Sequence, residues 1–188
     1  FIKGLIGYEL ITSDARWFNA SRDNFALQDY QQLGAGARDN MQNDGSADEW
    51  GLQSYFARVN YDYRGKYLLE ANIRRDGSSR FAEGEKYGTF PAFSAGWRVS
   101  EEPFFDNIGL ISDLKLRASW GQLGNQNTVN ANGDPIYYPF ASTIALGQDF
   151  LFGGAPVSGA AQTALANKLI SWETTETTNF GIDLGTTN

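Results

Sequence analysis

Carboxylates are the first candidates for chemistry, because paired acids perform general acid–base catalysis. Glu101-Glu102 and Asp48-Glu49 are direct neighbours in the sequence, and adjacent residues of an extended chain point to opposite sides. Nothing places two carboxylates at the separation that a glycosidase requires. Serine is present but histidine is not, which removes the ordinary Ser-His-Asp triad. We expect no catalytic residue and no enzyme activity.

Metal and cofactor sites are equally poorly supported. The chain has no Cys and no His, so the usual zinc ligands are missing. Asn40–Gly51 looks superficially like a calcium loop with Gly45 in its sixth position, but Gly51 then stands where a bidentate Glu belongs. This argues against an EF-hand and leaves an irregular cation site at Asp44, Asp48 and Glu49 as the alternative. We expect neither a resident metal nor a cofactor.

Composition narrows the class of protein. A net charge of −7 argues against nucleic acid as a partner. No stretch approaches the 18 or so apolar residues that a membrane-spanning helix needs. Aromatic residues make up 14% of a chain whose mean hydropathy is negative, at −0.40. That combination is typical of strands with one apolar and one polar face.

Alternation of apolar and polar residues predicts about six antiparallel strands. The clearest pair is a hairpin, in which residues 55–63 and 67–73 flank the tight link Arg64-Gly65. The apolar rows of the predicted strands are Ile2, Ile6, Tyr8 and Leu10; Tyr55, Ala57, Val59, Tyr61 and Tyr63; Tyr67, Leu69, Ala71 and Ile73; Phe93, Ala95, Trp97 and Val99; Leu114, Leu116, Ala118 and Trp120; Phe180, Ile182 and Leu184.

Loop lengths separate the two ends of the predicted sheet. Structureless loops are expected over residues 12–50, 76–87 and 124–171 at one end, whereas the short link at 64–66 and the modest connection 100–113 fall at the other. Outer-membrane barrels have this asymmetry, with an aromatic girdle that Tyr61, Tyr63 and Tyr67 would supply at the short-turn end. The chain begins within one alternating segment and ends just after another, so we expect a piece of a larger barrel.

A soluble β-sandwich also shows alternation and is the main alternative. Charged residues on the polar rows suit a wet barrel lumen as well as a solvated surface. Loops of roughly 40 residues without structure of their own are atypical of compact sandwiches. The pattern therefore favours the barrel.

Several long blocks of the chain resemble the SusC/RagA family of TonB-linked outer-membrane transporters. They are Tyr67–Phe81 (YLLEANIRRDGSSRF), Gly88–Phe104 (GTFPAFSAGWRVSEEPF), Leu114–Asn125 (LKLRASWGQLGN) and Trp172–Leu184 (WETTETTNFGIDL). The resemblance is dense over residues 55–125 and returns near Trp172. Several long blocks that follow one another in the order found in the family identify it more specifically than a short motif does.

The resemblance implies an all-β chain in which residues 1–188 form part of a 22-stranded transmembrane barrel. The plug domain, the TonB box and the signal peptide would lie outside these residues. It further implies import of oligosaccharides or peptides, a SusD-like surface lipoprotein, energy from the TonB–ExbB–ExbD complex, and an outer membrane with the long loops extracellular. The alternatives are a passive porin-type barrel and a soluble carbohydrate-binding β-domain.

Five residues are candidates for contact with substrate or partner. Asp76-Gly77-Ser78-Ser79-Arg80 is expected to form a turn in which Gly77 takes a positive φ and the side chains of Asp76 and Ser78 bond nearby backbone. Arg75, Asp76 and Arg80 would contact substrate or the lipoprotein. Trp50 and Trp172 lie at expected loop–strand junctions and are candidate platforms for stacking a glycan.

Overall fold

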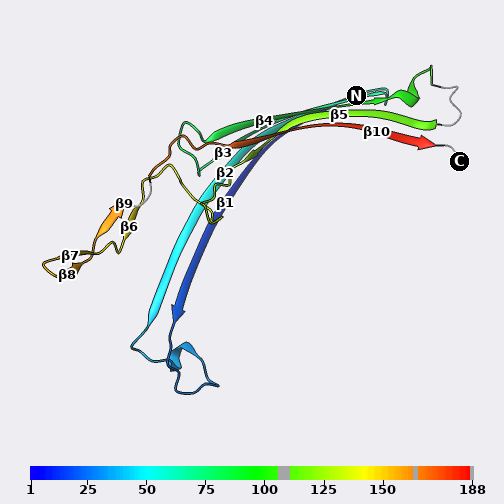
Figure 1. Ribbon diagram of the computed structural model, residues 1–188. Helices are drawn as coiled ribbons and strands as arrows, with labels where there is room; N and C mark the ends of the chain where they lie inside the picture. Colours follow the sequence, from blue (N-terminus) through cyan, green and yellow to red (C-terminus); the bar gives the residue numbers. More distant parts are fainter. Residues whose placement is uncertain (106–110, 163–164, 187–188) are drawn as a thin grey trace. The chain divides into compact units, whose positions relative to one another are not determined.

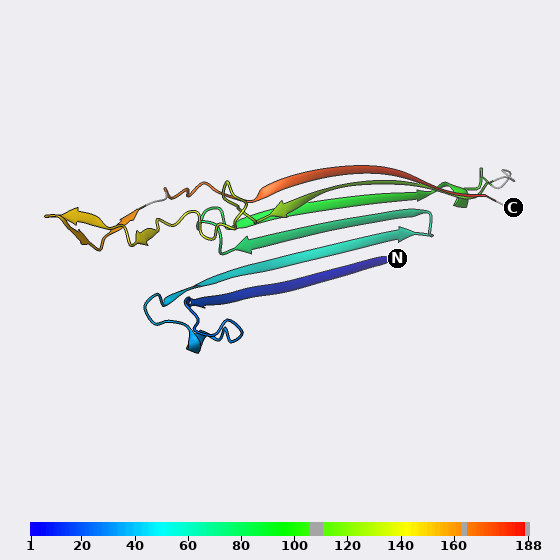
Figure 2. The same ribbon diagram turned by 60° about the horizontal axis from the view of Figure 1, so that its bottom comes forward.

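The computed structural model describes residues 1–105, 111–162 and 165–186, and its main feature is a six-stranded sheet (Figures 1 and 2). The strand order β1-β2-β3-β4-β5-β10 makes chain neighbours into sheet neighbours, and the pairs from β2 to β10 are antiparallel. All six predicted strands are present. Their bounds are β1 Ile2–Ser21, β2 Gln42–Tyr63, β3 Tyr67–Ser78, β4 Tyr87–Arg98, β5 Ile111–Asn125 and β10 Glu173–Thr186.

The remaining elements are short. β6 (Ile144–Leu146) pairs with β9 (Ala160–Gln162), and β7 (Phe150–Phe152) pairs with β8 (Ala155–Val157). The described residues also contain two 3₁₀ turns, η1 (Leu33–Ala35) and η2 (Val99–Glu101). Within the described ranges, no helix is long and apolar enough to cross a membrane.

The chain forms two compact units, residues 1–11 with 52–188 and residues 12–51. The second unit corrects the prediction of a structureless loop over residues 12–50, because β1 continues to Ser21 and β2 begins at Gln42. Backbone hydrogen bonds hold a ladder together whatever its side chains are. A strand with water on both sides needs no apolar row, so alternation gave no signal there. The loop predicted over residues 124–171 likewise contains the short ladders β6·β9 and β7·β8.

Strand register sorts the side chains of the first unit into two rows. Ala71 stands beside Val59 and Phe93, and Phe93 beside Trp120; we call the side of the sheet that carries these residues the apolar face. The other side, the polar face, carries the row Asn60, Glu70, Ser94, Ser119 and Asn179. The predicted apolar rows of β2, β3, β4, β5 and β10 are thus confirmed across strands, with one correction: Val99, predicted to end the row of β4, lies in η2 and is buried.

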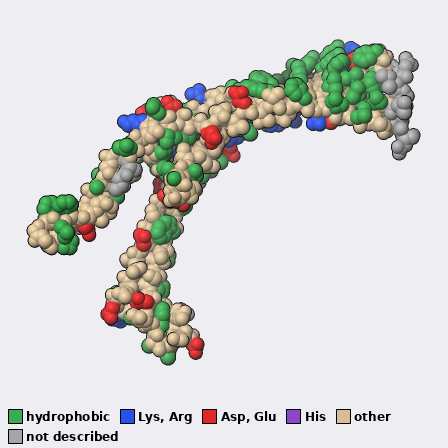
Figure 3. Space-filling view, in the orientation of Figure 1, with side chains coloured by type: hydrophobic (Ala, Val, Ile, Leu, Met, Phe, Trp, Pro, Cys, Tyr) green, Lys and Arg blue, Asp and Glu red, His purple; other side chains and the backbone are tan. Residues whose placement is uncertain are grey.

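The apolar face has no protein layer over it among the described residues. Val59, Leu69, Phe93 and Ile182 on this face are exposed, and the buried hydrophobic side chains of the described residues, Phe81, Phe90, Val99 and Phe105, lie off this row. Figure 3 shows hydrophobic side chains gathered over the strands toward the end where β5 begins. Contiguous apolar surface of this kind requires a non-aqueous neighbour.

Two aromatic rows border the apolar face. Tyr63, Tyr67 and Trp97 lie in register at the short-turn end, with Trp97 stacked on Tyr67 at 6.5 Å between ring centroids. Tyr8 and Tyr55 lie 5.2 Å apart toward the other end, the long-loop end. Tyr55 and Tyr63 are eight residues apart along β2, about 26 Å of extended strand. The apolar band of an outer-membrane barrel is about 25 Å high, which matches this spacing.

The short hairpin link has the geometry predicted for it. Arg64 and Gly65 both have positive φ, of 55° and 72°, and the amide of Lys66 donates to the carbonyl of Tyr63 at 3.0 Å. Positive φ at both central residues is the type I′ requirement. The carboxylate of Asp62 accepts from the Gly65 amide at 2.7 Å and fixes the turn.

Candidate functional site on the polar face and the long-loop end

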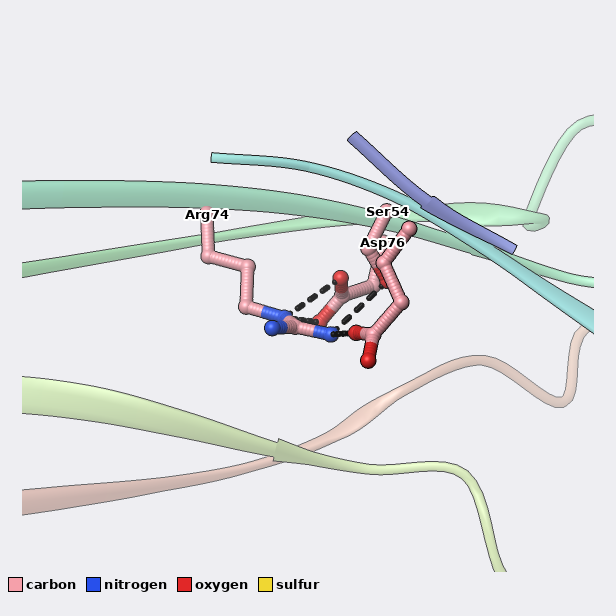
Figure 4. Close-up of polar contacts among 4 residues, drawn as sticks. Ser54, Arg74 and Asp76 are labelled. Atoms are coloured by element: carbon pink, nitrogen blue, oxygen red, sulfur yellow. Dashed lines mark hydrogen bonds and ion pairs between the residues drawn. The ribbon is translucent and has the colours of Figure 1, made fainter. Parts of the chain in front are cut away.

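Arg74 of β3 lies at the centre of a polar network toward the long-loop end of the polar face. Its Nε donates to both carboxylate oxygens of Asp76, at 2.8 and 3.0 Å, and its Nη2 donates to Ser54 Oγ at 2.8 Å (Figure 4). The same Nη2 lies 2.8 Å from Glu9 Oε2. One guanidinium therefore joins β1, β2 and β3, and charge-assisted bonds of this kind are among the stronger ones in proteins.

A second network continues along the same face. Arg58 Nε donates to Asn72 Oδ1 at 2.7 Å, and Asn72 Nδ2 donates to Glu70 Oε1 at 2.7 Å. Asn60 Nδ2 donates to the other oxygen of Glu70 at 2.5 Å. These side chains orient one another, so the polar face has a defined arrangement of donors and acceptors.

Arg75 and Asp76, adjacent predicted contacts, lie on opposite sides of β3. Asp76 is 8% exposed and belongs to the Arg74 network. Arg75 stands beside Tyr55 and Thr89, and its guanidinium lies 5.1 Å above the ring of Tyr87. This places Arg75 in the aromatic row at the long-loop end, where a long cationic side chain reaches the interface. The structure does not bring the two together.

The turn prediction at Gly77 was wrong. Gly77 pairs with Gln53 and Tyr87 inside β3 and does not have a positive φ. A Cβ at this position would run into the ring of Tyr87, so glycine is needed here for close approach and not for a turn. The role of Ser78 is confirmed, because its Oγ accepts from the Arg80 amide at 3.1 Å.

Arg80 joins two loops at the long-loop end. The side chain is 6% exposed, donates from Nη1 to Asn127 Oδ1 at 3.0 Å, and lies 4.8 Å above the ring of Tyr137. The β3–β4 connection is thereby held to the start of the segment that leads from β5 to β10. Burial leaves little of Arg80 accessible to a ligand.

Trp172 makes the matching contact at the end of that segment. Its ring packs 5.4 Å from Phe81 and 5.3 Å from Phe90, and its Nε1 donates to the Lys86 carbonyl at 2.9 Å. Phe81 is 1% exposed. Glycine at 88 and 124 makes room for the Phe90 ring, which a Cβ at either position would meet. We call Arg80, Phe81, Phe90, Tyr137 and Trp172 the loop cluster.

Trp50 is half-buried near the middle of β2 and belongs to the unit formed by residues 12–51. The predicted loop–strand junction at Trp50 was therefore wrong. The cation alternative at Asp44, Asp48 and Glu49 also falls within β2, where alternation turns Glu49 away from the other two. The described residues contain no group of three acidic side chains that could hold a metal ion.

The sequence reasoning missed several residues that organise the site. Neither Arg74 nor Glu9 was predicted to take part in a site, although their carboxylate–guanidinium bond joins residues 65 positions apart. Phe81 and Phe90 were not singled out. An apolar aromatic directly after Ser78-Ser79-Arg80, in an otherwise polar loop, was the available signal for Phe81.

Glu102 organises the short-turn end. Its Oε1 accepts from Tyr67 Oη at 2.7 Å and from Trp97 Nε1 at 3.2 Å, and Lys66 Nζ lies 3.4 Å from Oε2. The Glu102 side chain is 12% exposed. The hydrogen bond from Tyr67, then that from Trp97, and the charge of Lys66 hold the pKa of Glu102 below its ordinary value.

We expect this carboxylate to make stability depend on pH. A lowered folded-state pKa stabilises the fold above the unfolded-state pKa of about 4.3, and the contribution is lost as pH falls through the folded value. The free energy of unfolding of the full-length barrel should therefore be higher for wild type than for Glu102→Gln at pH 5, and this difference should disappear as pH falls to about 3. A constant difference across that window would show that Glu102 is not ionised in this cluster.

Comparison with a protein family explains the apolar and polar faces of the sheet and the difference between its short-turn and long-loop ends. Residues 3–188 match the model described as TonB dependent receptor-like, beta-barrel. The chain belongs to this family. TonB-dependent receptor barrels lie in the outer membrane, so the apolar face is the lipid side of the sheet and the polar face is the lumen side.

Curated relatives agree with this family. TonB-dependent receptor P39 of Formosa agariphila is 37% identical over 188 residues, covering 97% of this chain and 17% of the relative. TonB-dependent receptor SusC of Bacteroides thetaiotaomicron is 39% identical over 137 residues, covering 73% of this chain and 13% of the relative. The chain thus spans less than a fifth of the length of either relative.

Solved structures have the same fold. The RagAB peptide importer in its 'closed-closed' state superposes with a TM-score of 0.82 at 22% identity, covering 98% of this chain and 19% of that one. The 'open-open' state gives a TM-score of 0.81 at 22% identity, with the same coverage. The six strands are therefore a section of a TonB-dependent receptor barrel.

Proposed function

We propose that this chain is a section of the wall of an energy-dependent outer-membrane importer of oligosaccharides or peptides. In this proposal a SusD-like surface lipoprotein covers the long-loop end, which faces outward, and the TonB–ExbB–ExbD complex supplies energy. The observation that carries the proposal is the pair of opposite faces on one sheet. An apolar face between two aromatic rows suits lipid, and a charged, hydrogen-bonded face suits a wet lumen.

Similarity to the RagAB structures, which are described as a peptide importer, supports peptide as one candidate cargo. The resemblance to the SusC/RagA family supports oligosaccharide as the other. Membership in a TonB-dependent family favours active import over the passive porin and over a soluble carbohydrate-binding domain. The loop cluster would hold the outer loops in the shape that meets the lipoprotein.

The test is affinity purification of the full-length transporter, tagged in an outer loop, from outer membranes of its native host. We expect a surface lipoprotein to co-purify in stoichiometric amount. Uptake of the cargo should fall to background in cells that lack TonB. An untagged strain controls for carry-over. A barrel recovered alone, with uptake unchanged in the absence of TonB, would contradict the proposal.

A further inference from the structure

Arg75 is a cation on the apolar face. It is the single charged side chain in the apolar rows over residues 53–63, 67–77, 87–97 and 114–120. It is exposed, and no carboxylate in the described part of the chain forms an ion pair with it. Arg74, by contrast, meets Glu9 and Asp76 on the other face. A guanidinium at the edge of a bilayer takes water or a lipid headgroup as its acceptor.

The side chains around Arg75 fix the position of its guanidinium. It lies 5.1 Å above the ring of Tyr87, and that ring crosses β3 at Gly77, where a Cβ would overlap it. Tyr87 Oη donates to Gln53 Oε1 of β2 at 3.4 Å, and Gln53 Nε2 donates to Tyr55 Oη at 2.5 Å. The missing side chain at Gly77 therefore lets a ring from β4 reach across β3 to β2. Arg75 is held over this ring on the sheet, which a side chain that only reaches for water does not require.

The donors at this position suit phosphate. A guanidinium presents five N–H donors in a planar fork that binds phosphate in a bidentate way. Tyr55, in register with Arg75, accepts from Gln53 through its Oη, so its own proton is left for a further acceptor. The residue in register on the other side is Thr89, which carries no charge. An anion beside Arg75 therefore meets donors and no carboxylate in register.

A hollow of about 520 Å³ lies on the same face, nearer the middle of the strands. Ala95 and Ala118 are direct neighbours in register, and Ala71 is diagonal to Ala95. These small side chains leave a depression beside the stacked rings of Phe93 and Trp120, whose centroids are 6.0 Å apart. The lining also includes three residues of the polar row, whose side chains alternation turns to the other face: Glu70, Ser94 and Ser119.

The hollow and Arg75 lie along one path. Ala71 is four residues from Arg75 on β3, about 13 Å of extended strand, and Ile73 between them is exposed on the same face. Acyl chains run from the edge of a bilayer toward its middle. A lipid with its headgroup at Arg75 would therefore lay a chain over Ile73 and into the hollow, where the chain gains van der Waals contacts that a flat sheet does not offer.

We propose that the apolar face carries a binding site for an anionic lipid with phosphate in its headgroup. Arg75 and Tyr55 bind the phosphate, Tyr87 and Gly77 position the guanidinium, and one acyl chain fills the hollow. The lipid belongs to the leaflet at the long-loop end. This site lies on the opposite side of the sheet from the polar face, so the inference goes beyond the proposed function and does not depend on it.

Native mass spectrometry of the full-length transporter in neutral detergent tests the headgroup. The probes are dimyristoyl phosphatidylglycerol and dimyristoyl phosphatidylcholine, which has the same chains and no net charge. We expect wild type to bind the glycerol lipid about tenfold more tightly and Arg75→Gln to lose that preference. Arg38→Gln removes an exposed arginine from the unit formed by residues 12–51 and should keep it.

Filling the hollow tests the acyl chain. Wild type should prefer dimyristoyl over dihexanoyl phosphatidylglycerol, and Ala95→Phe should reduce that preference about fivefold. Ile182→Phe adds a ring on the same face outside the hollow and should not. Circular dichroism of each variant first checks that the sheet is retained.

Four results would overturn the inference. Wild type would bind the two dimyristoyl lipids equally, or Arg75→Gln would keep the preference for the anionic one. Displacement of the lipid by an equal concentration of inorganic phosphate would indicate a site for free phosphate. A dimer that Ala95→Phe dissociates, with lipid binding unchanged, would show that a second copy of the chain occupies the hollow.

Discussion

An arginine placed at Ala71 should lower the stability of the full-length barrel in a bilayer by about 2–4 kcal/mol. Ala71 lies on the apolar face, between Val59 and Phe93 and midway along β3 between Tyr67 and Arg75 of the two aromatic rows. A guanidinium there has no water and no acceptor in reach, and the cost is largest at the bilayer midplane. Denaturant titration of barrels folded into lipid vesicles measures the difference.

Position along the strand and choice of face provide two controls. Leu116 is on the same face but in register with Trp97 of the short-turn row, so Leu116→Arg should cost only about 0–1 kcal/mol. Ser94 is on the polar face beside Glu70, and Ser94→Arg should cost little because the new charge meets a carboxylate. Equal penalties at Ala71 and Ser94 would show that the faces were assigned incorrectly.

Removing the ring of Phe81 should have the largest effect at the long-loop end. Phe81 is 1% exposed and packs against Trp172, and Phe→Ala at buried sites costs about 3–5 kcal/mol. The loss should appear as local opening, because the ring holds the β3–β4 connection to the residues that lead into β10. Hydrogen exchange of the full-length barrel should rise at residues 79–86 and 165–172 and not in the centres of β3 and β4.

Phe104 is the matched control, since it is also a phenylalanine in a connection but is 64% exposed. Phe104→Ala should change stability by less than about 0.5 kcal/mol. If Phe81→Ala left hydrogen exchange in both segments unchanged, the loop cluster would not be what holds these loops.

The predicted contact residues have different structural roles, which depend on the side chains around them. Arg80 and Trp172 make contacts that hold the loops at the long-loop end, and Asp76 orients Arg74. Their contact with substrate or lipoprotein stays a prediction. Trp172 packs on Phe81 and Phe90 and also lines a pocket on the polar face together with Arg58 and Arg74.

The membrane-spanning parts of the strands could be read from the sequence. A barrel strand has lipid on one side and a wet lumen on the other, so apolar and polar residues alternate along it. Rows such as Tyr55 to Tyr63 can therefore be recognised without a structure. The tight link at Arg64-Gly65 could also be recognised, because a short glycine-containing link between two alternating runs is typical of a hairpin. Resemblance of whole blocks then gave the family, which residues 3–188 match.

Only the tertiary structure decided where the strands end and which side chains meet. Backbone hydrogen bonds continue β1 to Ser21 and start β2 at Gln42, and such bonds do not depend on an alternating side-chain pattern. Glu9 meets Arg74, and Phe81 meets Trp172, across separations of 65 and 91 residues that strand order alone brings together. A hydrophobic row is repeated along one strand and can be recognised locally. A contact between two loops occurs only once, and the types of the two residues do not indicate that they will meet.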